Sequence, residues 1–179
     1  MTYQKWEQDK EFMSLISDLL DRDEVQQLKE ITQHYYSTRL EHSISVAYRS
    51  FSIGKKLKCD TRALARAGLL HDLFYYDWRS TKFAEGSHAY VHPRIACDNA
   101  EKLTALSDLE KDIIVKHMWG ATIAFPKYKE SYIVTMVDKY CACDEAISPL
   151  FTKMKQSFSS QWTRVKQSLS INTIPTNIK

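Results

Sequence analysis

Glycine and proline are scarce in this sequence, with four of each among 179 residues. A β-sandwich consists of many short strands joined by turns, and turns depend heavily on these two residues. Their scarcity argues against that fold class and favours one all-α domain of six to eight helices spanning residues 1–179. Apolar residues make up 44% of the sequence, which is enough to bury a core and excludes disorder over most of its length.

An excess of one charge and long apolar runs are also missing. Lysine and arginine number 25 against 22 aspartates and glutamates, so the net charge is +3. No basic stripe stands out, so we expect no binding of extended nucleic acid, whereas a small anionic substrate remains compatible with the charge. No run of about 18 apolar residues occurs, and therefore no membrane span is expected.

The cysteines contain no C-x-x-C pair, and the first ten residues are polar. The four cysteines are Cys59, Cys97, Cys141 and Cys143. Because no export signal is recognisable, this usage predicts reduced thiols in a cytoplasmic protein.

Apolar residues recur at steps of three and four along most of the chain, which is the spacing of amphipathic helices. The predicted helices cover residues 12–20, 25–35, 40–57, 62–71, 92–103, 108–118, 132–140 and 150–171. The core of the domain is expected within residues 38–146. The last helix would close this core or pack against a second subunit, so a homodimer is one expectation.

Residues 75–90 and 120–128 break the helical pattern. The first break is long, and loops of about 15 residues are usually functional or mobile. His92-Pro93 ends it, and since proline favours the first helical position, His92 is expected at or next to an N-cap. Asp60 or Thr61 is predicted to cap the helix before this loop, and the segment Ser107–Glu110 is a predicted capping box.

Histidines and aspartates recur along these predicted helices. In chain order they are His42, His71, Asp72, His92, His117 and Asp138. Each step corresponds to about one helix plus one connection, so antiparallel helices could bring all of them to one level. Helix bundles build metal sites from side chains on facing helices in this way.

Two of these residues are predicted to face inward. His71 shares a helical stripe with Leu64, Ala67 and Gly68. Asp138 follows an apolar run, and a buried aspartate is costly unless it is paired or binds a metal. Imidazole and carboxylate together suit Fe, Mn, Zn, Co or Ni, and additional carboxylates or waters suit Mg or Mn.

Taken singly, each residue has a simpler interpretation. His42 could be a helix-surface residue, His71 a hydrogen-bonded core residue and His92 a helix N-cap. His117 could be a cation at a helix C-terminus, and Asp138 could belong to an ion pair. The partner of Asp138 would then be Lys139 or Arg94. A single shared site explains all five together.

The order H…HD…H…H…D resembles that of the HD superfamily of metal-dependent phosphohydrolases. The strings that carry the resemblance are Glu41-His42-Ser43, ARAGLLHD ending at Asp72, His92-Pro93-x-x-Ala96 and Val137-Asp138-Lys139. It covers about residues 38–146 and implies an all-α helical bundle of the HD type. The sequence is similar to small bacterial HD-domain proteins, but this similarity does not indicate which substrate is used.

The resemblance implies a set of ligands for one divalent metal ion, namely His42, His71, Asp72 and Asp138. His92 and His117 match positions that hold a second ion in some members, with Asp72 bridging the two. Asp72, His92 and His117 are therefore the expected catalytic residues. His88 could replace His92 or contact phosphate, but His92-Pro93 is the better match to the family string.

One branch of the superfamily is disfavoured. Phosphodiesterases of cyclic dinucleotides carry H-D-I-G-K and G-Y-P elements. Here the residues from His71 to Tyr75 read H-D-L-F-Y, and G-Y-P is absent. This departure argues against hydrolysis of cyclic di-GMP.

The predicted activity is hydrolysis of a phosphoester or phosphoanhydride, preferably of a nucleotide. One or two divalent ions would lower the pKa of a bound water, so that hydroxide attacks phosphorus at neutral pH. Candidate substrate-binding residues are His88, Lys82, Arg94, Lys139 and Trp119, with Arg79 and Trp78 in the same loops. Cations would neutralise phosphoryl charge and a tryptophan could stack on a base, although solvated charge and core packing are the simpler interpretations.

Two other functions stay open at this stage. The protein could be a nucleotide- or metal-binding sensor without turnover, or a helical domain that only binds a partner. The enzyme is favoured because both expected sets of metal ligands are complete.

Overall fold

A computed structural model describes residues 5–34 and 37–147 of the chain. The predicted helix over residues 150–171 lies outside the described residues. Helices dominate the described part and the sheet has two very short strands, so the predicted all-α fold is confirmed. No helix in this part combines the length and apolar character needed to cross a membrane.

The N-terminal region begins with α1 (Lys5–Gln8) and α2 (Lys10–Leu20). The Asp9 carboxylate caps α2 by accepting from the Phe12 amide at 3.1 Å. The helix buries Phe12, Ile16, Leu19 and Leu20, as its periodicity predicts.

The predicted helix over residues 25–35 is wrong. The chain instead forms α3 (Asp23–Gln26), a 3-10 turn η1 (Gln27–Glu30) and the antiparallel strands β1 (Thr32–His34) and β2 (Ser37–Thr38). The backbone carbonyl of Ile31 accepts from the Arg39 amide at 2.8 Å, so this segment turns back onto the start of the next helix. Tertiary contacts here override a weak local pattern. Tyr35 lies outside the described residues.

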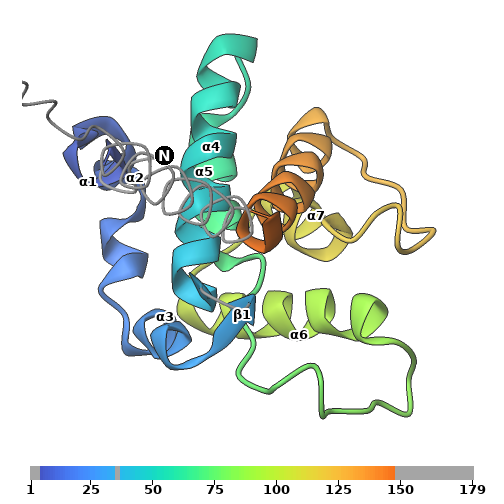
Figure 1. The fold of residues 1–179 in the computed structure, drawn as a ribbon. Coiled ribbons are helices and arrows are strands. Elements are labelled where there is room, and N and C mark those ends of the chain that lie inside the picture. The colour runs from blue at the N-terminus through green and yellow to red at the C-terminus, as the bar shows by residue number, and fades with distance from the viewer. Residues whose placement is uncertain (1–4, 35–36, 148–179) are drawn as a thin grey trace, which may run out of the picture.

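Two helices, α4 (Arg39–Leu57) and α5 (Thr61–Leu70), form the centre of the molecule (Figure 1). A Thr38–Glu41 capping box starts α4, and the Asp60 side chain caps α5, as predicted for the latter. The helices approach closely at Gly68, where a Cβ atom would lie 2.9 Å from the Cα atom of Ala47. The missing side chain of Gly68 therefore allows α4 and α5 to pack this closely.

The remaining described helices are α6 (His88–Leu103), α7 (Asp108–Lys116) and one over residues 129–147, drawn in orange in Figure 1. The predicted capping box is confirmed, since Ser107 and Glu110 cap each other at the start of α7. The placement of His92 at an N-cap is wrong, because α6 begins at His88 and contains Pro93. His88 stacks on His92, one turn later, at 4.2 Å between ring centroids, and this contact supports the additional turn.

The predicted helix over residues 132–140 is confirmed as part of a longer helix over residues 129–147. Val134, Val137 and Cys141 are buried, whereas Met136 and Tyr140 are 61% and 51% exposed. The buried face carries Asp138 toward α4 and α5, because Asp138 follows Val134 by one turn.

Candidate metal centre

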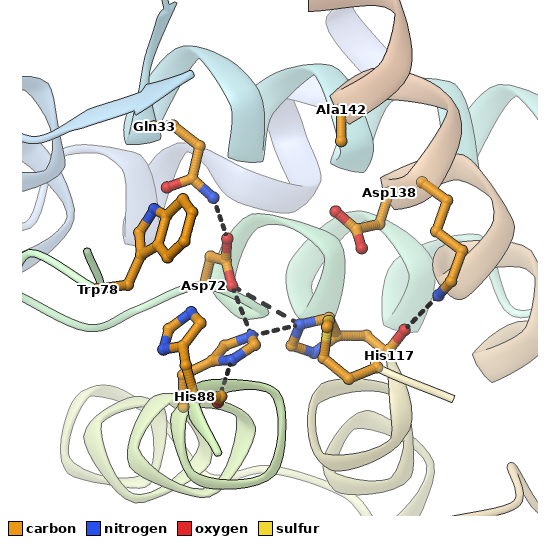
Figure 2. Close-up of a pocket in the computed structure, with 10 residues that line it drawn as sticks. Gln33, Asp72, Trp78, His88, His117, Asp138 and Ala142 are labelled. Atoms are coloured by element: carbon orange, nitrogen blue, oxygen red, sulfur yellow. Dashed lines mark hydrogen bonds and ion pairs between the residues drawn. The ribbon is translucent and has the colours of Figure 1, made fainter. Parts of the chain in front are cut away.

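The six predicted ligands lie together, although they come from five helical segments. Figure 2 shows three of them, Asp72, His117 and Asp138, at the pocket. His42 belongs to the first turns of α4, His71 and His117 directly follow α5 and α7, and His92 belongs to α6. The four imidazoles are between 0% and 3% exposed. The simpler interpretation of His42 as a surface residue is therefore wrong.

Asp72 lies at the centre of the cluster and has a different partner set at each carboxylate oxygen. Its Oδ1 atom is 3.2 Å from Nε2 of His92 and 3.6 Å from Nε2 of His117. Its Oδ2 atom is 3.8 Å from Nε2 of His71. We call His42, His71 and Asp138 the acidic half of the cluster, and His92 and His117 the imidazole half. Asp72 joins the two.

The acidic half is organised around the Asp138 carboxylate. Its Oδ1 atom lies 3.0 Å from Nε2 of His42 and 3.6 Å from Nε2 of His71. Burial raises the pKa of Asp138, but the hydrogen bonds with His42 and His71 outweigh it and lower that pKa below its ordinary value. Asp138 is thus paired with histidines, and its predicted alternative pairing with Lys139 or Arg94 is not observed.

Burial disfavours the charged form of His42, yet hydrogen bonds with Asp138 and Glu145 raise its pKa to about 10. A proton therefore balances part of the carboxylate charge of this half in the metal-free protein. A divalent cation can replace that proton, because metal ligands bind in their deprotonated form.

The imidazole half has the opposite character. Burial, reinforced by the neighbouring His92 and His71, lowers the pKa of His117 to about 3, so its ring is neutral. The Nε2 atoms of His92 and His117 face each other at 2.8 Å.

The hydrogen-bond network assigns the tautomers of three rings. Nδ1 of His71 donates to the carbonyl of Gly68 at 2.8 Å, and Nδ1 of His117 donates to that of Ile114 at 2.7 Å. His92 does the same toward the carbonyl of His88. Because a carbonyl oxygen only accepts, each of these rings carries a proton on Nδ1 and turns its Nε2 atom toward the cluster.

Two buried atoms lack a hydrogen-bond partner at this point, Nε2 of His71 and Oδ1 of Asp72. Burying such atoms without a partner costs about 1–3 kcal/mol each. One ligand atom each from His42, His71 and Asp72 lie within 4.8 Å of one another, as do those from Asp72, His92 and His117. Imidazole nitrogens and carboxylate oxygens are ligands for divalent transition metals, so the residues fit one or two such ions.

A pocket with a cavity volume of about 240 Å³ opens beside the cluster. Its lining residues are Gln33, Asp72, Trp78, His88, His92, His117, Met118, Asp138, Lys139 and Ala142. Lys139 donates to the carbonyl of His117 at 3.3 Å, which holds its ammonium next to the centre. The rings of Trp78 and His88 stack at 5.7 Å on the opposite side.

Three predicted substrate-binding residues do not line this pocket. Lys82 is exposed, and Arg94 packs its guanidinium on the ring of Tyr90 and donates to the Tyr90 carbonyl. Trp119 packs against Phe125 and Tyr132 instead. Arg94 and Trp119 thus have partners outside the pocket, and Lys82 does not line it, so the pocket gives no support to their predicted role.

Arg79, which lies in the same loop as Lys82, also stays outside the lining. Its guanidinium donates to the Gln33 carbonyl at 3.1 Å and lies over the ring of Trp78. Arg79 therefore contacts two lining residues, Gln33 and Trp78, without lining the pocket itself.

Sequence reasoning missed Gln33, which orients the central carboxylate. Its Nε2 donates to Oδ2 of Asp72 at 2.7 Å, and its Oε1 accepts from Nε of the fully buried Arg39 at 2.7 Å. Arg39 also donates to the Phe74 carbonyl and stacks on the Phe74 ring. Because a guanidinium only donates, it fixes the amide so that the Gln33 NH₂ group faces Asp72.

A comparison with protein-family models matches residues 39–142 to the HD domain. The match covers more than half of the chain, so the chain belongs to the HD domain family, which is all-α and of the metal-dependent phosphohydrolase type. No curated protein and no solved structure gave a significant match.

Proposed function

We propose that the protein hydrolyses a phosphoester or phosphoanhydride of a small substrate, preferably a nucleotide, in a metal-dependent reaction. The observation that carries the proposal is the convergence of imidazole Nε2 atoms from His71, His92 and His117 on Asp72, which touches both halves of the cluster. When bound, one or two divalent ions would polarise a phosphoryl oxygen and lower the pKa of a water molecule.

The ligands that would hold these ions divide at Asp72. His42, His71 and Asp138 would hold one ion with the Oδ2 side of Asp72. His92 and His117 would hold the other with its Oδ1 side. Gln33 keeps the carboxylate in the orientation that serves both, because it occupies Oδ2 with a single hydrogen bond.

The pocket offers one contact for a phosphoryl group and one for a base. Lys139 is the one lysine or arginine among the described lining residues, and its ammonium would bind a phosphoryl oxygen. A single ammonium complements one phosphoryl group better than a polyphosphate, which favours a phosphomonoester. Trp78 is 37% exposed, so part of its ring is free to stack on a planar base.

His88 lies between the metal centre and Trp78. Burial and the neighbouring His92 lower its pKa to about 4, so the ring is neutral at physiological pH. Its Nδ1 atom lies 3.2 Å from the hydroxyl of Tyr76, which fixes the ring in the pocket wall. A neutral imidazole in this place would hydrogen-bond the substrate without adding charge.

The proposal is tested by phosphate release from a panel of nucleotides and simple phosphomonoesters, with Mn²⁺, Mg²⁺ or Fe²⁺ present under anaerobic conditions. We expect turnover that disappears in His71→Ala and persists in Lys82→Ala, which changes a residue outside the pocket. Tight nucleotide binding without turnover would favour the sensor instead. Failure to bind any metal would leave only a helical partner-binding domain.

A further inference from the structure

The imidazole of His42 is anchored differently from those of the other site histidines. The Nδ1 atoms of His71, His92 and His117 donate to neutral backbone carbonyls. Nδ1 of His42 instead lies 3.0 Å from Oε1 of the Glu145 carboxylate. A carboxylate accepts a hydrogen bond more strongly than a carbonyl, so His42 has the most polarised ring of the four.

Glu145 is held in place from its second oxygen. Its Oε2 atom accepts from the Ser37 hydroxyl at 2.6 Å, and its side chain is 7% exposed. Ser37 belongs to β2 and directly precedes Thr38, the N-cap of α4. The carboxylate therefore connects the start of α4 to the helix over residues 129–147.

Asp138 and Glu145 also share one face of that helix, because seven residues correspond to about two turns. His42 lies between their carboxylates, with 3.0 Å from Nε2 to Asp138 and 3.0 Å from Nδ1 to Glu145. One helix thus fixes both edges of one ring. The family match ends at residue 142, so Glu145 lies beyond it.

We propose that Glu145 is a positioning residue that holds His42 through Nδ1 and directs its Nε2 lone pair into the metal centre. The inference rests on the proposed function, since it assigns a role toward the metal of that site. A carboxylate on the outer nitrogen of a metal-binding imidazole fixes the tautomer and makes the inner nitrogen a better ligand. The acidic half would then hold its ion more tightly than backbone-anchored histidines alone allow.

The test compares Glu145→Ala and Glu145→Gln with Asp144→Asn. Asp144 is a neighbouring carboxylate paired with Arg49 at 3.5 Å, so its variant removes the same charge as Glu145→Gln from an adjacent position. Binding of Mn²⁺ is measured by calorimetry, and binding of Co²⁺ by its visible absorption. Circular dichroism verifies that each variant folds.

We expect Glu145→Ala to weaken binding at the acidic half by about 10- to 100-fold, the range found for such outer partners. Glu145→Gln should recover part of the loss, because the amide oxygen still accepts from Nδ1. Asp144→Asn should stay close to the wild-type affinity. In the metal-free protein, the ring Nδ1–H resonance of His42 should be slow to exchange in the wild type and in Glu145→Gln, and lost in Glu145→Ala.

Wild-type affinities in both Glu145 variants would overturn the inference, as would an equal loss in Asp144→Asn. Should Glu145→Ala not fold, the comparison of Glu145→Gln with Asp144→Asn decides. If the wild-type protein binds neither ion, the proposed function fails. The ring resonance then decides the Glu145 contact by itself, and its persistence in Glu145→Ala overturns the inference.

Discussion

The two halves of the cluster differ in how their buried histidines are protonated in the metal-free protein. In the acidic half, carboxylates raise the pKa of His42 to about 10, so a proton compensates their charge when no metal is bound. In the imidazole half, burial keeps His117 neutral, and its Nε2 lone pair faces Nε2 of His92. Before a cation binds, a buried imidazole can therefore either hold a proton, as His42 does, or stay neutral, as His117 does.

The largest effect is expected from removing what the halves share. Asp72→Ala should abolish metal binding at both, with more than about 100-fold loss of affinity, because ligand removal exceeds the loss of an outer partner. Phosphate release should disappear with it, while helix content by circular dichroism stays near that of the wild type. Elemental analysis that still finds bound metal would contradict the bridging role.

Variants confined to one half should separate them. His92→Ala or His117→Ala should lower the metal content from two ions toward one, because the acidic half keeps all its ligands. His42→Ala should do the same from the other side. Elemental analysis of each purified variant measures the content, and an unchanged value in His92→Ala and His117→Ala would mean that only a mononuclear centre exists.

The lysine beside the centre should matter more than the cations outside it. Lys139→Ala should raise KM for a phosphomonoester about 10-fold, since a charge-assisted hydrogen bond contributes about 1.5–3 kcal/mol where it is made. Steady-state kinetics with Lys82→Ala and Arg94→Ala provide matched controls, because both side chains lie outside the pocket lining. Equal effects in all three variants would contradict the assigned contact.

The helices that position His42 and His71 can be disturbed without substituting a ligand. Gly68→Ala places a Cβ atom 2.9 Å from Cα of Ala47, so α4 and α5 must separate. Overpacking of this kind costs about 1–3 kcal/mol of unfolding free energy, measurable by urea denaturation. Metal binding should weaken more at the acidic half, because α4 and α5 position its His42 and His71, than at the imidazole half. The reverse order would show that the helix contact does not set the ligand spacing.

The halves should also give the metal-free protein opposite pH dependences of stability. His42 has a pKa raised from 6.5 to about 10, so its stabilising contribution is complete below pH 6.5 and is lost as the pH rises through about 10. His117 has a pKa lowered to about 3, so the unfolded chain gains a proton first and stability falls as the pH drops from 6.5 toward 3. Tm measured across this range should fall at both ends.

The matched variants assign each slope. His42→Asn should flatten the alkaline decline of Tm, and His117→Asn should reduce the acidic one, to which the lowered pKa values of Asp72 and Asp138 also contribute. An alkaline slope that survives in His42→Asn would show that another group carries it.

Local rules predicted much of this fold from the sequence. Asp60 and Ser107 cap their helices because a cap depends on residues three positions apart, and the all-α class followed from composition and periodicity. The ligand set was also predictable, since its histidines and aspartates follow one another along the chain in the order typical of HD proteins. The family match and the clustering of these side chains agree with that expectation.

The residues that support the ligands were not predictable, because their roles depend on distant contacts. Gln33 reaches Asp72 across 39 residues from a strand that periodicity assigned to a helix. Glu145 meets His42 across 103 residues.

The central claim is tested most directly by anomalous diffraction from crystals of the protein grown with Mn²⁺. The account predicts peaks bounded by the ligand atoms of the two groups, His42, His71, Asp72 and Asp138 on one side and Asp72, His92 and His117 on the other. A map with no peak at Asp72, and with Nε2 of His92 still hydrogen-bonded to Nε2 of His117, would contradict it.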